Sequence, residues 1–154
     1  MAVFRFRAQA ARDLRRREYE EAQRQRAEAE RDRSVAESRL HRATEAVVDA
    51  QRAARDAQAN GHSAHELDWY RSWIDRLVYE RHAHTLILKA RTQQAADAAS
   101  ACQRAHQRWE ALERFYEKAK RAHEAAESAA ERKLIDELAT QRYAAARPLE
   151  GEYR

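Results

Sequence analysis

The sequence predicts an all-α protein: a long two-helix antiparallel coiled-coil hairpin in which the second helix is longer than the first. Charged residues make up 36% of the 154 residues, whereas Gly occurs twice and Pro once, which leaves little material for turns. Apolar residues, many of them Ala, recur every seven positions on both sides of one turn, as in a coiled coil. That turn, Asn60-Gly61, separates two long stretches of good helix formers.

The expected boundaries follow from the turn and from Pro148. We expect a first coiled-coil helix over 1–59, uninterrupted from about Phe4, a turn at 60–63, a second coiled-coil helix over 64–146 and a tail at 147–154. Pro148 should end the second helix, because proline cannot continue the helical hydrogen bonding.

The first helix carries a heptad seam made mostly of alanine. One line of the seam is Ala22, Ala29, Ala36, Ala43, Ala50 and Ala57, and the alternate line includes Tyr19, Leu40, Val47 and Ala54. Arg26 and Arg33 stand at seam positions that normally hold apolar side chains. Their stems can cover the seam while the guanidinium reaches water, so we expect weak packing there.

The turn combines a helix stop with a helix start. Gly61 suits the left-handed position just past a helix end. Ser63 and Glu66 have the spacing of a capping box, in which each residue bonds the backbone or side chain of the other. Because the connection is only about four residues long, the two helices should lie antiparallel.

The second helix has a seam richer in large side chains. One line reads Leu67, Ile74, Arg81, Leu88, Ala95, Cys102, Trp109, Tyr116 and His123, and the other reads Tyr70, Leu77, His84, Arg91, Ala98, Ala105, Leu112 and Ala119. If the helices fold about the turn, residue i should face about residue 123 − i. That register places Phe4 and Phe6 near Phe115 and Tyr116, and Leu14 near Trp109.

The C-terminal part of the second helix should extend as an overhang past its partner. Beyond about Lys120 the first helix offers nothing to pair with, yet Leu134, Ile135 and Leu138 keep to one side. An apolar stripe without a partner in its own chain is typical of a surface that docks on another protein.

No enzyme is indicated, and we expect no catalytic residue, metal site or cofactor. His82 and His84 are two residues apart, whereas two ligands on one helix face need a spacing of three or four. Cys102 lies on the seam and reads as a small packing residue. With no stretch approaching ~20 apolar residues, we also expect no membrane span and a cytoplasmic location.

Aromatic residues beside the turn exceed what the seam requires. Leu67, Tyr70, Ile74 and Leu77 fill the seam, so Trp69 and Trp73, four residues apart, should lie off it on one face. Two interpretations stay open. The indoles clasp the tip of the hairpin against the first helix, or they form an exposed patch for a partner, since Trp and Tyr dominate interface hot spots.

Three segments in order resemble the FliJ family of the flagellar type III export apparatus, which is related to the injectisome stalk proteins. They are Phe4-Arg5-Phe6 with Leu14-Arg15, the turn followed by Trp69-Tyr70 and Trp73-Ile74, and the stretch Glu131-Arg132-Lys133 with Asp136-Glu137-Leu138-Ala139 and Arg142. The resemblance implies a non-enzymatic stalk that enters a hexameric export ATPase ring, contacts a membrane export gate protein and handles export chaperones, at the inner face of the cell membrane.

The resemblance also implies two sets of binding residues. The ring-facing residues would be Phe4, Phe6, Arg12, Leu14, Arg16, Asp136, Glu137, Leu138 and Arg142, and the gate-facing residues would be Trp73, Leu77 and His84, to which the position of Trp69 adds a fourth. This chain has Ala43, Ala46 and Ala50 where the family can carry larger residues, so the gate face would either lie on the second helix alone or be weaker.

Two alternatives remain. The first seventeen residues hold six arginines against one aspartate, Asp13, as in a nucleic-acid-binding basic coiled coil. A basic zipper needs a Leu-rich parallel seam, however, and this seam is Ala and Arg, so we expect no nucleic acid. The other alternative is an architectural or chaperone coiled coil of an injectisome. The sequence does not distinguish flagellum from injectisome, or monomer from dimer.

Overall fold

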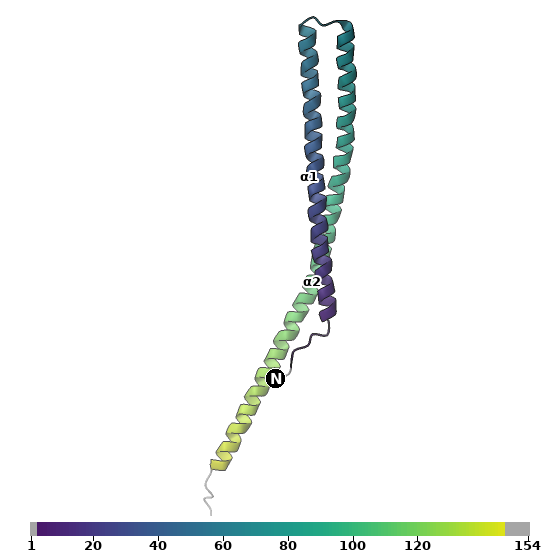
Figure 1. Ribbon diagram of the computed structural model, residues 1–154. Helices are drawn as coiled ribbons and strands as arrows, with labels where there is room; N and C mark the ends of the chain where they lie inside the picture. The colour runs from purple at the N-terminus through teal and green to yellow at the C-terminus, as the bar shows by residue number, and fades with distance from the viewer. Residues whose placement is uncertain (1–2, 147–154) are drawn as a thin grey trace, which may run out of the picture. The chain divides into compact units, whose positions relative to one another are not determined.

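The computed structural model describes residues 3–146 and consists of two helices in that range (Figure 1). Helix α1 spans Gln9–Ala59 and helix α2 spans Ala64–Ala146. The all-α class and the longer second helix are therefore confirmed. The predicted tail at 147–154 lies outside the described residues.

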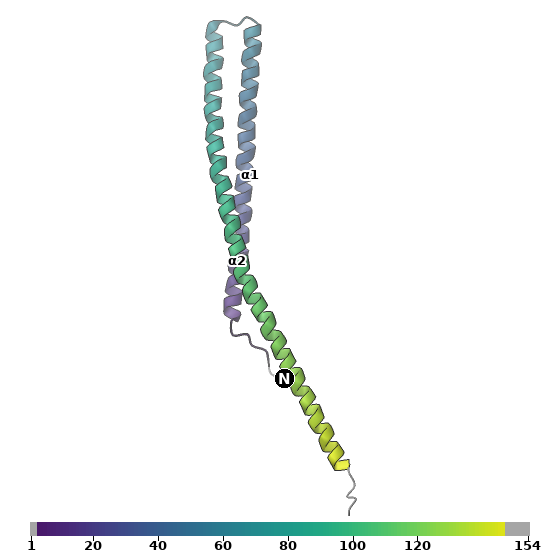
Figure 2. The ribbon, with the colours of Figure 1, turned by 180° about the vertical axis from the view of Figure 1, so that it is seen from behind.

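The chain divides into two compact units, which we describe separately. The hairpin unit comprises residues 16–107, and the terminal unit comprises the described parts of 1–15 and 108–154. In the hairpin unit, α1 and α2 run side by side in opposite directions, as both views show (Figures 1 and 2).

The core of the hairpin unit is the predicted seam. Val47, Ala50 and Ala57 of α1 are at most 4% exposed, and Ala95 and Cys102 of α2 are also buried. Arg26, at a weak seam position, remains exposed. Small side chains suffice because two helices meet only along one stripe.

The pairing register agrees with the one expected from folding about the turn. Asp32 should face residue 91 in that register, and Asp32 Oδ2 lies 3.2 Å from Arg91 Nη1. Tyr19 lies against His106 with ring centroids 5.0 Å apart, two residues away from the ideal register.

The turn is built as predicted, by a helix stop and a capping box. Gly61 has a φ of 76°, and the His62 amide donates to the Ala57 carbonyl at 3.1 Å, which closes the last turn of α1. At the start of α2 the Ser63 amide donates to Glu66 Oε2 at 2.8 Å, and the Glu66 amide reaches Ser63 Oγ at 3.4 Å.

Helix α1 begins later than the expected start near Phe4. Residues 3–6 have no regular structure, and the Gln9 amide donates to the Phe6 carbonyl at 3.1 Å where the helix starts. Burial alternates along this segment, with Phe4, Phe6 and Ala8 half-buried and the residues between them exposed. A helix turns by about 200° over two residues and could not place Phe4 and Phe6 on one side, so their contacts favour a non-helical segment.

Candidate functional site

A bidentate ion pair ties the start of α1 to α2 within the terminal unit. Arg12 Nε donates to Glu113 Oε2 at 2.8 Å and Arg12 Nη2 donates to Glu113 Oε1 at 2.6 Å. The guanidinium carbon also lies 4.0 Å from the centroid of the Tyr116 ring. The hydrogen bonds to Glu113 raise the pKa of Arg12 further above its ordinary value, against the opposing effect of burial. Arg12 is thus held by a fork of hydrogen bonds and a cation–π contact.

Aromatic rings extend this contact toward the N-terminus. Phe6 packs on both Phe115 and Tyr116, with centroids 5.4 Å apart in each case. Phe4 packs on Tyr116 at 5.7 Å and on His123 at 5.4 Å. The sequence-based expectation that Phe4 and Phe6 meet Phe115 and Tyr116 is confirmed. We call this group, together with Arg12 and Glu113, the terminal clasp.

The terminal clasp accounts for three of the nine residues expected to face the ATPase ring. Phe4, Phe6 and Arg12 lie against α2, where they hold the N-terminal segment in place. Leu14 is 53% exposed, and Arg16 pairs with Glu20 on its own helix at 3.0 Å.

The remaining four expected ring-facing residues form a separate group on α2. Asp136, Glu137, Leu138 and Arg142 are exposed. Leu138 follows Glu113 by 25 residues, which at ~1.5 Å per residue separates them by roughly 37 Å along the helix. The structure therefore gives two groups along α2 rather than one contiguous patch.

An apolar stripe accompanies the second group. Leu134, Ile135 and Leu138 are 57%, 63% and 49% exposed. Leu138 follows Leu134 by four residues and Ile135 by three, so the three side chains lie on one side of α2. This exposed stripe of three large aliphatic side chains has the character of a docking surface. The three aliphatic residues that the sequence singled out in this part of α2 are thus exposed.

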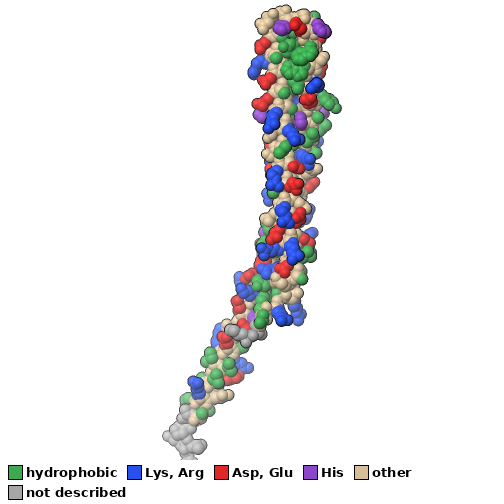
Figure 3. Space-filling view, viewed as in Figure 1, with side chains coloured by type: hydrophobic (Ala, Val, Ile, Leu, Met, Phe, Trp, Pro, Cys, Tyr) green, Lys and Arg blue, Asp and Glu red, His purple; other side chains and the backbone are tan. Residues whose placement is uncertain are grey.

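The aromatic group beside the turn lies within the hairpin unit. Trp69 packs on Trp73 in a tilted arrangement, with ring centroids 5.3 Å apart, and edge-to-face on Tyr70, with centroids 5.1 Å apart. Trp69 is 59% exposed, whereas Trp73 is half-buried. Figure 3 shows hydrophobic side chains gathered near the turn.

The other expected gate-facing residues, Leu77 and His84, are half-buried at seam positions. Beside them toward the turn, His62, His65, Glu66, Trp69 and Tyr70 line an open depression of about 340 Å³. Trp69 is thus the most exposed side chain of the aromatic group beside the turn.

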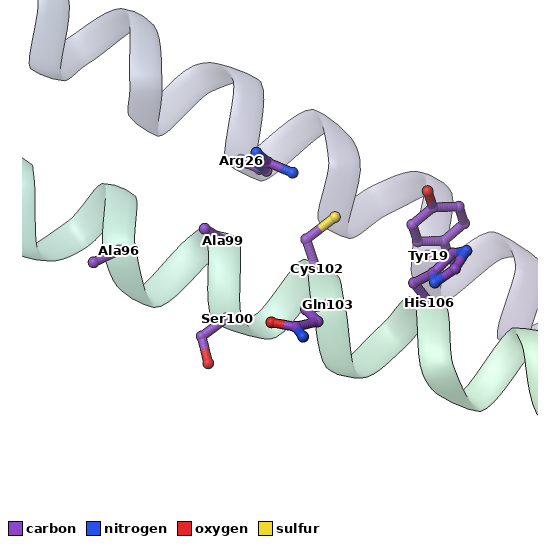
Figure 4. A pocket seen from close by; sticks show the side chains of 8 residues that line it. All are labelled: Tyr19, Arg26, Ala96, Ala99, Ser100, Cys102, Gln103 and His106. Atoms are coloured by element: carbon purple, nitrogen blue, oxygen red, sulfur yellow. The ribbon is translucent and has the colours of Figure 1, made fainter.

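A second depression, of about 680 Å³, lies where the seam is thinnest (Figure 4). Small side chains at Ala96, Ala99 and Ser100 leave the gap, and Arg26 borders it from α1. Cys102 is buried at the same place. Within residues 3–146, no group of three or more His, Cys, Asp or Glu side chains is placed so that it could hold a metal ion.

Sequence reasoning missed Glu113 and His123 as partners of the N-terminal segment. The expected register places Arg12 within two residues of Glu113. The opposite charges of these two residues across the seam were therefore a signal in the sequence for the ion pair. The heptad pattern indicates only a seam position for His123, because its ring contact with Phe4, two turns beyond Tyr116, requires the non-helical start of the chain.

Comparison with known proteins gives one match. The family model described as "Flagellar FliJ protein" matches residues 6–148, nearly the whole chain. No curated protein and no solved structure matches this chain. None of the helices in the described range is long and apolar enough to cross a membrane.

Proposed function

We propose that this chain, which belongs to the FliJ family of flagellar proteins, is the stalk of a flagellar export apparatus. Family membership assigns it to flagellar protein export in general terms. The finer proposal is that it inserts into a hexameric export ATPase ring and also contacts the membrane export gate. The observation that carries the proposal is the family match over residues 6–148, which spans both helices and the turn.

The ring contact is proposed for the exposed residues of the terminal unit. Leu134 and Leu138 offer apolar side chains beside the charged residues Glu137 and Arg142. The terminal clasp supports this surface indirectly, because Phe4, Phe6 and Arg12 fix the N-terminal segment on α2. In this proposal the clasp residues position the stalk, and the residues after 130 touch the ring.

The test is ATP hydrolysis by the purified cognate ATPase with and without this chain. Wild-type protein should raise hydrolysis and ring formation, and Leu138→Asp combined with Arg142→Glu should abolish both effects. Val48→Asp is a matched control, because Val48 is 44% exposed, close to the 49% of Leu138, and lies in the hairpin unit. Unchanged hydrolysis on adding wild-type protein would refute the ring contact.

The gate contact is proposed for the aromatic side of α2 near the turn. Trp69 is exposed and supported by stacking on Trp73, so it presents a large ring at little entropic cost on binding. Leu77 and His84 lie along the same helix. Binding of this chain to the soluble domain of the gate protein should weaken at least tenfold in Trp69→Ala, and Tyr143→Ala, at another exposed aromatic, should bind like wild type.

Handling of export chaperones and a location at the inner face of the membrane are the remaining parts of the proposal. Both rest on the family match alone. Co-purification of the chain with an export chaperone, tested with tagged wild-type protein and the Trp69→Ala variant, would show whether the same surface serves both partners.

A further inference from the structure

One flank of α2 in the hairpin unit is apolar and exposed. With the seam at Tyr70, Ile74 and Leu77, heptad spacing places Trp69, Trp73, Tyr79, Ala83, Leu86 and Ile87 together on one outer side of the helix. Tyr79, Leu86 and Ile87 are 75%, 56% and 44% exposed, so the apolar flank continues well past the two tryptophans.

Charge is nearly absent from this flank. Between residues 69 and 87, all of which the structure describes, Arg76 and Glu80 are the two charged residues on that side, in a chain with 36% charged residues. Arg76 Nε lies 3.4 Å from Glu80 Oε1, so the pair is neutral as a unit. A basic surface for anionic lipid is therefore not what the flank offers.

The flank is complementary to itself. If a second copy lies antiparallel with residue i facing residue 156 − i, Arg76 meets Glu80 of the second copy, and Glu80 meets its Arg76. The same register sets the large Trp73 against the small Ala83 and sets Trp69 against Ile87. Residues that exchange in this way are what a twofold interface requires, since each copy presents the same patch.

We propose that the apolar flank is a self-association surface, which a second copy of this chain covers in an antiparallel twofold dimer. The inference goes beyond the export role and does not rest on it; because the dimer covers Trp69, self-association and the proposed gate contact exclude each other. The stretch 69–87 is ~27 Å long at ~1.5 Å per residue and about one helix diameter, ~10 Å, wide. That is small for a stable interface, so the dimer should dissociate on dilution through the micromolar range.

Sedimentation equilibrium of the full-length protein tests the proposal, with a reductant present so that Cys102 forms no disulfide. Between about 5 and 300 μM the wild-type mass should rise from one chain of 18.0 kDa toward twice that value. Ile87→Glu should weaken the dimer at least tenfold. Val48→Glu is the matched control, because Val48 is also 44% exposed but lies on α1 outside the flank, and it should dimerise like wild type.

Charge exchange tests the register. Arg76→Glu alone should weaken the dimer, because two glutamates then face each other, and Glu80→Arg alone should do the same through two arginines. The double variant should restore dimerisation. Circular dichroism of each variant verifies that α2 remains helical.

Three results would overturn the proposal. They are a single-chain mass at every concentration, dimerisation of Ile87→Glu equal to that of Val48→Glu, and a charge-exchanged double variant no better than the single ones. The first removes the dimer, the second moves it off this flank, and the third rules out the antiparallel register.

Discussion

Replacing Glu113 with Ala should loosen the attachment of the N-terminal segment to α2. The carboxylate accepts two charge-assisted hydrogen bonds from Arg12, at 2.8 and 2.6 Å, and the two side chains are 25% and 30% exposed. Charge-assisted bonds contribute about 1.5–3 kcal/mol when well protected, whereas fully exposed pairs contribute about 0.2–1 kcal/mol. The Arg12–Glu113 pair has about a quarter of its surface in water, so its contribution should lie between these two ranges. We expect a coupling energy of about 1 kcal/mol between the two side chains.

The two single substitutions should differ in cost. Arg12→Ala also loses the contact with the Tyr116 ring, whose centroid is 4.0 Å away, and such a contact adds about 0.5–1 kcal/mol. We expect unfolding free energy to fall by about 1 kcal/mol in Glu113→Ala and by about 1.5–2 kcal/mol in Arg12→Ala. The double variant should resemble Arg12→Ala rather than the sum of both.

Urea denaturation followed by circular dichroism at 222 nm gives the three free energies and hence the coupling. Hydrogen exchange of the first turns of α1 gives a local measure of the same loosening. Glu117→Ala, at an exposed carboxylate on the same helix, is the control and should change little. A coupling energy below about 0.3 kcal/mol, within the scatter of independent sites, would refute the reasoning.

Three further predictions concern the turn and the terminal clasp. Gly61→Ala should cost about 1 kcal/mol in a thermal melt, because the φ of 76° strains any side chain although the added Cβ meets open space. Hydrogen bonds from the Ser63 amide and hydroxyl lower the pKa of Glu66, so the stability they contribute is complete above the ordinary pKa of 4.5 and is lost as pH falls through the lowered folded pKa. A pH titration of wild type against Glu66→Gln, which has no carboxyl to titrate, should show this acid loss only in wild type. Phe6→Ala should cost about 2–3 kcal/mol by urea denaturation, less than in a closed core, since Phe6 is only half-buried against Tyr116.

The helices, the turn and the register were predictable because each depends on local chemistry or on a repeat. Ala at every seventh position fixes which side of α1 is buried, and Val47 and Ala50 are indeed buried there. Gly61 and the pair Ser63 and Glu66 set the turn through bonds that span only a few residues. Patterns of this kind do not depend on how distant parts of the chain meet.

The start of α1 was less predictable, since Phe4 and Phe6 have no helix-breaking neighbours. The alternation of Phe4 and Phe6 with arginines was the signal for a non-helical segment. It becomes decisive only once Tyr116 is known to pack against both phenylalanine rings. The Arg12–Glu113 bond depends in the same way on a contact between residues 101 apart in the sequence. The apolar flank was visible only in part, because Tyr79 and Leu86 show their exposure after the seam has been placed.

The most direct test of the stalk proposal is the mass of the complex between this chain and the hexameric export ATPase. Single-particle mass measurement of the mixture with ATP should show rings heavier than the hexamer by 18.0 kDa, the mass of one chain, because a central stalk fits a ring once. Leu138→Asp combined with Arg142→Glu should leave the ring mass unchanged. Rings that gain no mass with wild-type protein, or that gain six chains, would contradict the account.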